Sequence, residues 1–366
     1  MVERGRRVVG GVDTHKDIHV AAAVDDVGRI LGTEEFPTTA RGHRALLAWL
    51  GRFGVVVRVG VEGTGAYGAG LARYLAKAGV DVVEVDRPNR QTRRRRGKSD
   101  PVDAEVAARA ALSGEASGRP KSRTGAVEMI RALRVARRSA RKARTQAVNQ
   151  IRDLIITAPD ELRATLRDLT LKEVVDRAER WRPGPVTSPA AATKLALSVL
   201  AQRYQALGAE MERLDVELDR LVAETAAPLL ERRGLGTDTI AALLVAAGDN
   251  PQRLKSEASF AALCGASPVD ASSGKQQRHR LNRAGDRQAN EALWRVVLVR
   301  MATDPRTKDY VARRVKEGKT KKEAIRCLKR YVAREIYHEL MASLPDPAVA
   351  APTPYRRSSG RTPCLL

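Results

Sequence analysis

The sequence has few cysteines and few aromatic residues. Its three cysteines, Cys264, Cys327 and Cys364, lie far apart, are odd in number and form no C-x-x-C pair. This pattern argues against a disulfide framework and against a structural zinc site. Aromatic residues make up only 4% of the chain, whereas charged residues reach 30%. A large part of the surface must therefore be charged.

Long apolar runs are also missing. No uninterrupted apolar stretch reaches the roughly 18 residues typical of a membrane span. The beginning of the chain, MVERGRRVVGG, lacks the apolar core of a signal peptide. We therefore expect a cytoplasmic protein without membrane contact. The 366 residues, of which 43% are hydrophobic, predict two or three domains with ordinary cores.

Acidic residues are scarce relative to basic ones. The chain has 66 Lys and Arg against 43 Asp and Glu, a formal net charge of +23. This excess favours a polyanionic partner, because phosphate neutralisation and counterion release drive such binding. The alternative is a basic protein without such a partner. The basic residues are clustered rather than scattered, which favours a nucleic acid.

The N-terminal region alternates between strand-like and helical patterns. Three apolar segments rich in β-branched residues within 7–40 predict three consecutive strands. They are followed by a helix over 40–54, a strand over 55–65, a helix over 66–79 that ends at Gly79, and a strand over 80–86. This succession predicts an α/β layer architecture. It is also the order of elements in the RNase H fold.

The middle of the chain is strongly basic. Residues 87–98, RPNRQTRRRRGK, hold seven basic residues and no acid, and they show no hydrophobic period, which predicts a loop. Ser99 or Asp100 is then expected to cap a helix that has Pro101 in its first turn. The segment 119–156 predicts a long, Arg-rich helix.

A regular apolar seam marks a second long helix. Its positions alternate between spacings of three and four residues, as in a coiled coil: Leu197, Leu200, Tyr204, Leu207, Met211, Leu214, Leu218 and Leu221. The seam can serve dimerisation, which we favour, or it can pack within the chain against the helix over 126–156. The two arrangements can coexist.

We expect four parts in the chain. Residues 1–118 form the α/β domain, 119–228 a helical coiled-coil region, 229–342 a mainly α-helical domain and 343–366 a disordered tail. The third part begins with a pattern that resembles a helix-hairpin-helix, RRGLGTDTIAALLVAAGD. In such an element a glycine turn joins two helices, and its backbone amides can meet a DNA phosphate.

Four acids stand out by their positions. Asp13 ends the first predicted strand and Glu62 ends the fourth, and strand ends of an open sheet face the crevice where ligands bind. Asp100 and Asp103 are three residues apart at a helix start, so both can lie on one face. Such carboxylates repel one another unless cations bind, and oxygen ligands select Mg²⁺ or Mn²⁺. Two such ions would stabilise the attacking and leaving oxygens of a phosphodiester displacement.

Simpler interpretations exist for each acid alone. Asp13 can cap a turn, and Asp100 and Asp103 can cap their helix. The combination of the four positions on one fold is what predicts the metal site. His15 and His19, which lie near Asp13, are expected to be packing or surface residues rather than ligands.

The chain resembles the insertion-sequence-110 family of transposases. GVDTHKDIHV, VEGTGAYGAGLARYLAKAGVDVVEVDRP and KSDPVDAEVAA are similar to its successive N-terminal motifs. GLGTDTIAALLVAAGD, followed by FAALCGASPVDASSGKQQRHRLNRAGDRQANEALWR, resembles its C-terminal transposase domain. The likeness spans residues 7–340. One local departure is Ser99–Asp100–Pro101, where the family more often has a Thr before the Asp and a polar residue after it.

The resemblance carries implications for fold and site. It implies an RNase H-like N-terminal domain similar to the RuvC Holliday-junction resolvase, with a DEDD set of metal ligands at Asp13, Glu62, Asp100 and Asp103. It also implies a serine nucleophile before a glycine, which here is Ser273, with Ser272 as the fallback. This serine would attack a DNA phosphate and hold one strand end covalently. By sequence alone, SSGK is an ordinary polar turn.

The partners follow from charge and resemblance together. Basic residues expected to contact phosphates are Arg93, Arg94, Arg95, Arg96, Lys98, Lys275, Arg278, His279, Arg280, Arg283 and Arg287; a solvated basic loop is the alternative. The resemblance implies donor and target DNA, a structured non-coding guide RNA and a homo-oligomer. The basic 87–98 loop and the Arg-rich 119–152 helix are candidate RNA or DNA surfaces. Two rival functions are a RuvC-type junction-resolving endonuclease, which needs no serine, and a nucleic-acid-binding protein without catalysis.

Overall fold

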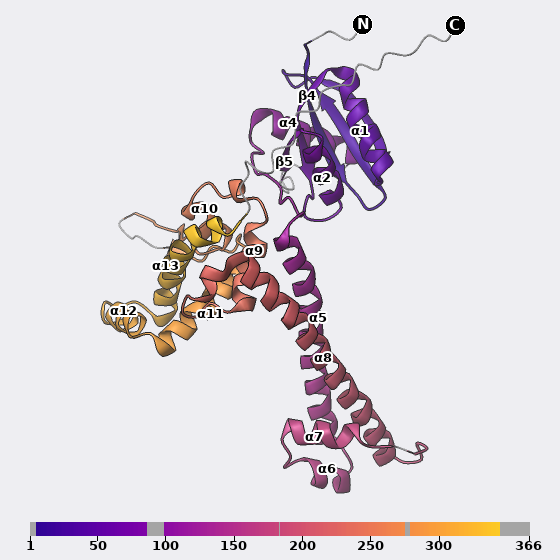
Figure 1. Cartoon of the computed structure of the whole chain (residues 1–366), viewed down its shortest axis with the longest axis vertical. Coiled ribbons are helices and arrows are strands. Elements are labelled where there is room, and N and C mark those ends of the chain that lie inside the picture. The colour runs from indigo at the N-terminus through magenta and orange to yellow at the C-terminus, as the bar shows by residue number, and fades with distance from the viewer. Residues whose placement is uncertain (1–4, 86–98, 183, 275–278, 345–366) are drawn as a thin grey trace. The chain divides into compact units, whose positions relative to one another are not determined.

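Figure 1 shows the computed structural model of the chain, which describes residues 5–85, 99–182, 184–274 and 279–344. These residues form two compact units. The first unit comprises the described residues of Met1–Gly125 and Ala247–Phe260, with Leu344. The second unit comprises those of Ala126–Ala246 and Ala261–Ser343. The four-part division expected from the sequence remains a prediction, and residues 87–98 and 345–366 lie outside the described residues.

The first unit is built on a mixed five-stranded sheet with the order β3-β2-β1-β4-β5. Its strands are β1 (Arg7–Thr14), β2 (Ile18–Val24), β3 (Ile30–Pro37), β4 (Val55–Glu62) and β5 (Asp81–Val85). β2 is antiparallel to both β1 and β3, whereas β4 is parallel to β1 and to β5. Parallel neighbours need a crossover, which the helices α1 (Ala40–Phe53) and α2 (Ala69–Lys77) supply. The predicted succession of strands and helices is confirmed.

Helices cover both faces of this sheet (Figure 1). On one face, Leu46 of α1 and Leu71 of α2 share a core cluster with Val12 of β1. On the other face lies α4 (Asp100–Ser113), whose Ala107 packs in a cluster with Val83 of β5. Because side chains alternate along a strand, residues at odd and even positions of β1 face different helical layers.

The second unit contains an antiparallel helical hairpin. Its two long helices are α5 (Ala126–Ile156) and α8 (Pro189–Leu230), and Figure 1 shows them side by side. Arg137 pairs with Asp215, and Arg144 donates to Tyr204 at 2.7 Å, so the partners run in opposite directions. The short helices α6 (Asp160–Leu166) and α7 (Leu171–Glu179) share a hydrophobic cluster with one end of the hairpin.

The apolar seam of α8 packs within the chain. Leu197, Leu218 and Leu221 are buried, and the seam positions between them are half-buried. The intramolecular hairpin, which we placed second to dimerisation, is therefore present. Dimerisation through the same seam remains a prediction.

The remainder of the second unit is mostly helical. Its helices are α9 (Thr237–Ala247), α10 (Glu257–Leu263), α11 (Arg287–Thr303), α12 (Pro305–Lys316) and α13 (Lys321–Ala342), of which α9 and α10 extend into segments of the first unit. A short hairpin pairs β6 (Val269–Asp270) with β7 (His279–Arg280). The predicted glycine turn between two helices lies between α8 and α9, where Gly234 has a φ of +84°. Among the helices in the described ranges, none combines the length and apolarity needed to cross a membrane.

Candidate active site

Two of the predicted acids lie side by side at the ends of neighbouring strands. In the parallel pairing of β1 and β4, Val12 lies opposite Val61, which places Asp13 beside Glu62. Both side chains are buried, each with 7% of its surface exposed. Val12 and Val61 pack against α1 and α2. Asp13 and Glu62 therefore point to the opposite face, toward α4.

Two glycines allow α4 to lie close to these strand ends. A Cβ atom at Gly11 would lie 2.1 Å from the backbone nitrogen of Ala108, and one at Gly60 would lie 2.6 Å from the backbone oxygen of Ala107. Each glycine precedes an acid by two positions and shares its face of the sheet. The first turn of α4 is thereby brought to the acids of β1 and β4. Sequence reasoning missed both glycines, although G-x-D and G-x-E were visible.

The other two acids lie in the first turn of α4. Asp103 is 6% exposed, whereas the Asp100 side chain is 49% exposed. Ser99 occupies the N-cap position, but its side chain makes no capping hydrogen bond. Burial raises the pKa of Asp13 above its usual range, and the nearby Asp103 and Asp100 raise it further, while His15 opposes them. Three of the four acids are thus close enough to influence one another.

His15 lies among these carboxylates. Its Nε2 atom is 3.1 Å from Oδ2 of Asp13 and 3.4 Å from Oδ2 of Asp100. One possible ligand atom from each of these three residues lies within 4.8 Å of the other two. We expected His15 to be a packing or surface residue rather than a ligand; its side chain is 47% exposed, and the structure places it in this group of possible ligands. The D-x-H spacing puts the side chains of Asp13 and His15 on the same side of the end of β1. This spacing is the sequence feature that could have indicated their contact.

Further contacts hold this edge of the sheet together. The Thr14 hydroxyl donates a hydrogen bond of 2.8 Å to the backbone oxygen of Glu62, which ties the ends of β1 and β4 to each other. His19 is fully buried on β2, and its ring stacks on that of His43 with 5.5 Å between centroids. The expected packing role fits the position of His19.

The two candidate serines belong to the second unit. They lie in the turn that follows β6, before Gly274, whose φ is +55°. The Ser272 hydroxyl donates a hydrogen bond of 2.5 Å to Oδ1 of Asp270, and its backbone N–H donates another of 2.8 Å. These two bonds lower the pKa of Asp270. Ser272 is therefore engaged in the turn, and Ser273 beside it is exposed.

Some of the basic residues expected at phosphates can be placed. Arg280, Arg283 and Arg287 are exposed at and after β7, as is His279. The others lie outside the described residues: Arg93, Arg94, Arg95, Arg96, Lys98, Lys275 and Arg278.

The carboxylate cluster fits a hard divalent cation. Carboxylate oxygens suit Mg²⁺ or Mn²⁺, and a cation would relieve the repulsion around buried Asp13. The donor set includes no thiolate that would favour a softer metal, and the described Cys264 is buried elsewhere. The cluster can thus hold the kind of ion that assists phosphodiester chemistry.

Two family models match the chain. Residues 10–157 match the DEDD transposase model of the IS110 group, which is described as Transposase. Residues 226–312 match the model described as Transposase IS116/IS110/IS902 family. A comparison with curated proteins gives no match. The first matched segment contains all four acids and the second contains both serines, so the chain belongs to the IS110 family of transposases.

Proposed function

We propose that this transposase cuts and joins DNA strands at the carboxylate cluster of its first unit, and that this unit has an RNase H-like fold of the RuvC type. The sheet order β3-β2-β1-β4-β5, with only β2 antiparallel to its neighbours, supports that fold. The convergence of Asp13, His15 and Asp100 within 4.8 Å is the observation that carries the proposal.

The four acids have distinct environments in this proposal. Asp13, Glu62 and Asp103 form the buried part of the site, and the half-exposed Asp100 lies where a substrate can approach. Two divalent cations, Mg²⁺ or Mn²⁺, would supply charge stabilisation to the attacking and leaving oxygens of the phosphodiester. Gly11 and Gly60 fix the position of the α4 acids by permitting close packing. His15 orients the carboxylates of Asp13 and Asp100 through its ring nitrogen.

We infer that Ser273 is the nucleophile of strand transfer, with Ser272 as the fallback. A serine is a weak nucleophile unless a base or a metal activates it. Both serines are exposed, but the hydroxyl of Ser272 is engaged with Asp270, which favours Ser273. The serine hydroxyl would lose its proton and its oxygen would form a bond to phosphorus, while the 3′ or 5′ oxygen of the cut strand leaves and takes up a proton. In joining, the hydroxyl of a strand end would lose its proton and attack the same phosphorus, and the serine oxygen would leave and regain a proton.

The partners form part of the same proposal. Donor and target DNA, a structured non-coding guide RNA, a homo-oligomeric state and a cytoplasmic location rest on the family resemblance and on the net charge of +23. Arg280, Arg283 and Arg287, exposed after the serine turn, would contact the phosphates that flank the cut. Sequencing the DNA next to the gene tests the proposal of a guide RNA. A short mobile element with a non-coding region beside the reading frame would support that proposal.

Strand cutting and adduct formation by three variants test the chemistry. Asp13→Ala should abolish Mg²⁺-dependent cutting and joining of the element's ends, and recombination at the wild-type rate would contradict the metal site. Ser273→Ala should abolish any covalent protein–DNA adduct, whereas Ser272→Ala should retain it. An adduct that is lost only in Ser272→Ala would show that Ser272, and not Ser273, is the nucleophile. A wild-type enzyme that cuts without any adduct would instead be a junction-resolving nuclease that uses water.

A further inference from the structure

The second unit contains a basic cavity whose lining residues include none of the four acids and no residue of the serine turn. Its volume is about 490 Å³, and residues of α5, α9 and α11 line it. Six cationic side chains face it but only two acidic ones, Asp238 and Glu291. A cavity with this excess of positive charge is suited to an anion.

The α5 wall of this cavity is one continuous helical face. Its lining residues recur at spacings of three and four, from Arg134 to Asn149. At 1.5 Å per residue this face extends for roughly 22 Å. That length matches several successive phosphates along a strand, which lie about 3.4 Å apart along the axis of a duplex. A single small anion would occupy only a part of it.

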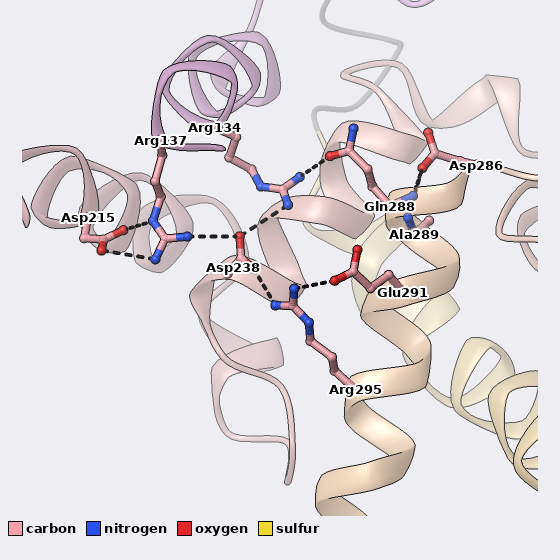
Figure 2. Close-up of polar contacts among 9 residues, drawn as sticks. All are labelled: Arg134, Arg137, Asp215, Asp238, Asp286, Gln288, Ala289, Glu291 and Arg295. Atoms are coloured by element: carbon pink, nitrogen blue, oxygen red, sulfur yellow. Dashed lines mark hydrogen bonds and ion pairs between the residues drawn. The ribbon is translucent and has the colours of Figure 1, made fainter. Parts of the chain in front are cut away.

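At the floor of the cavity, three arginine side chains surround the carboxylate of one aspartate. Asp238 accepts from Arg134 at 3.3 Å and from Arg295 at 2.8 Å, and Arg137 lies 3.7 Å from it (Figure 2). Figure 2 shows the three guanidinium groups, which come from two different helices, converging on this carboxylate. Arg134 is itself buried, with 6% of its surface exposed. Shared pairing fixes the direction of the guanidinium groups. Because Arg137 also pairs with Asp215 and Arg295 with Glu291, this part of the cavity is close to neutral, and its excess positive charge lies with Arg138, Arg141 and Lys142.

The rim of the cavity carries cations that have no carboxylate partner among the described residues. Arg138, Arg141 and Lys142 are exposed and lie on the cavity face of α5. Next to them along the same face are neutral hydrogen-bonding side chains, including Thr145 and Asn149. Exposed cations beside amide and hydroxyl groups are the side chains that proteins commonly use for phosphate and sugar contacts.

We propose that this cavity and the α5 face hold the phosphodiester backbone of a nucleic-acid strand. Arg138, Arg141 and Lys142 would contact its phosphates, and the guanidinium groups paired at Asp238 would form the floor beneath them. The contact is to the backbone, so it positions a strand without reading its bases. This inference rests on the proposed function for its choice of a nucleic acid, and it adds a phosphate-binding face on α5, distant in sequence from the residues expected to flank the cut.

Binding by a charge-neutralised variant tests the site. Arg141→Gln/Lys142→Gln removes two exposed rim cations, and Lys194→Gln/Arg203→Gln removes one Lys and one Arg from exposed positions of α8 outside the cavity. Fluorescence anisotropy of a labelled DNA duplex and of a labelled RNA hairpin would be measured over a series of salt concentrations. EDTA is present throughout, so that the carboxylate site takes no part.

We expect the cavity variant to bind about tenfold more weakly at low salt, with the slope of log K against log salt reduced by about 1.8 for the duplex. The control variant should retain most of the affinity and slope. A loss for the duplex alone, for the hairpin alone or for both supports the site and identifies the strand that it holds. Equal binding by the two variants with both probes overturns it. Because no strand is cut in EDTA, that outcome leaves the proposed catalysis untouched.

Discussion

Asp13 is a buried carboxylate with two further aspartates near it. Burial raises its pKa, and the charges of Asp103 and Asp100 add to this effect. A carboxylate in this position is unfavourable to the fold unless a cation neutralises it. Strand-end reasoning from the sequence predicted where Asp13 lies. It could not predict the contact of His15 with Asp100, because that contact depends on how α4 docks on the sheet.

The stability of an Asp13→Asn variant follows from this environment. Without divalent metal, the free energy of unfolding should stay level or rise by about 1 kcal/mol, since a buried charge and its repulsion are removed. In the wild type, Mn²⁺ at about 100 times its Kd should raise the free energy of unfolding by about 2.7 kcal/mol. In the variant, Mn²⁺ should not produce this increase. Urea unfolding with and without Mn²⁺ measures both. A metal-induced gain that persists in Asp13→Asn would argue against its role as a ligand.

His19 makes the first unit sensitive to acid. Burial lowers its pKa to about 4, and the neighbouring His43 and His15 add to the shift. Because the folded pKa is below the unfolded value of about 6.5, the unfolded state binds protons more readily. The stabilisation from neutral His19 is complete above about pH 6.5 and declines as the pH falls toward 4.

His19→Phe keeps an aromatic ring against His43 and removes the titration. Thermal unfolding of this variant should change less between pH 7 and pH 5 than that of the wild type. His338→Gln, which alters an exposed histidine of the second unit, serves as the control and should follow the wild-type curve. Parallel acid curves for the wild type and His19→Phe would show that another group titrates.

At the scale of elements, the packing of α4 on the sheet depends on Gly11 and Gly60. Gly11→Ala would place a methyl group 2.2 Å from the backbone oxygen of Ala104, so the helix must move away. We expect a loss of about 3 kcal/mol in the free energy of unfolding, together with weaker Mn²⁺ binding. In Gly51→Ala, nothing lies within 4 Å of the new methyl group. The higher helix propensity of alanine should raise the free energy of unfolding by about 1 kcal/mol. Equal stabilities of the two variants would contradict the close-packing argument.

Element-level prediction from the sequence succeeded where periodicity was strong. Apolar runs rich in β-branched residues predicted β1 to β5, and the spacing of the seam predicted α8. The partner of the seam could not be decided, because Leu197 and Leu218 pack equally well against a helix of the same chain or of a second copy. The structure places α5 there.

At the scale of the whole chain, residues far apart in sequence create the basic cavity. The Arg-rich helix was visible in the sequence, but its pairing with Asp238 and with α11 was not, since no local pattern links them. Burial alone would raise the pKa of Asp238, but Arg134, Arg137 and Arg295 outweigh it and hold that pKa below its usual range.

Asp238→Asn should therefore destabilise the second unit. The change leaves the buried guanidinium of Arg134 without its anionic partner, and we expect a loss of about 2 kcal/mol in the free energy of unfolding at neutral pH. The difference from the wild type should shrink as the pH falls through the pKa of Asp238, because the wild-type carboxyl is then neutral as well. Urea unfolding at neutral and acidic pH measures this. A loss of equal size at both pH values would point to a packing defect instead.

The central claim is that acids from β1, β4 and α4 hold divalent cations for DNA strand transfer. Anomalous diffraction from crystals grown with Mn²⁺ and a DNA substrate tests it most directly. We predict a manganese peak about 2.1 Å from carboxylate oxygens of Asp13 and Asp100, in contact with a DNA phosphate. Ordered side chains of Asp13, Glu62, Asp100 and Asp103 with no manganese between them and the DNA would contradict the account.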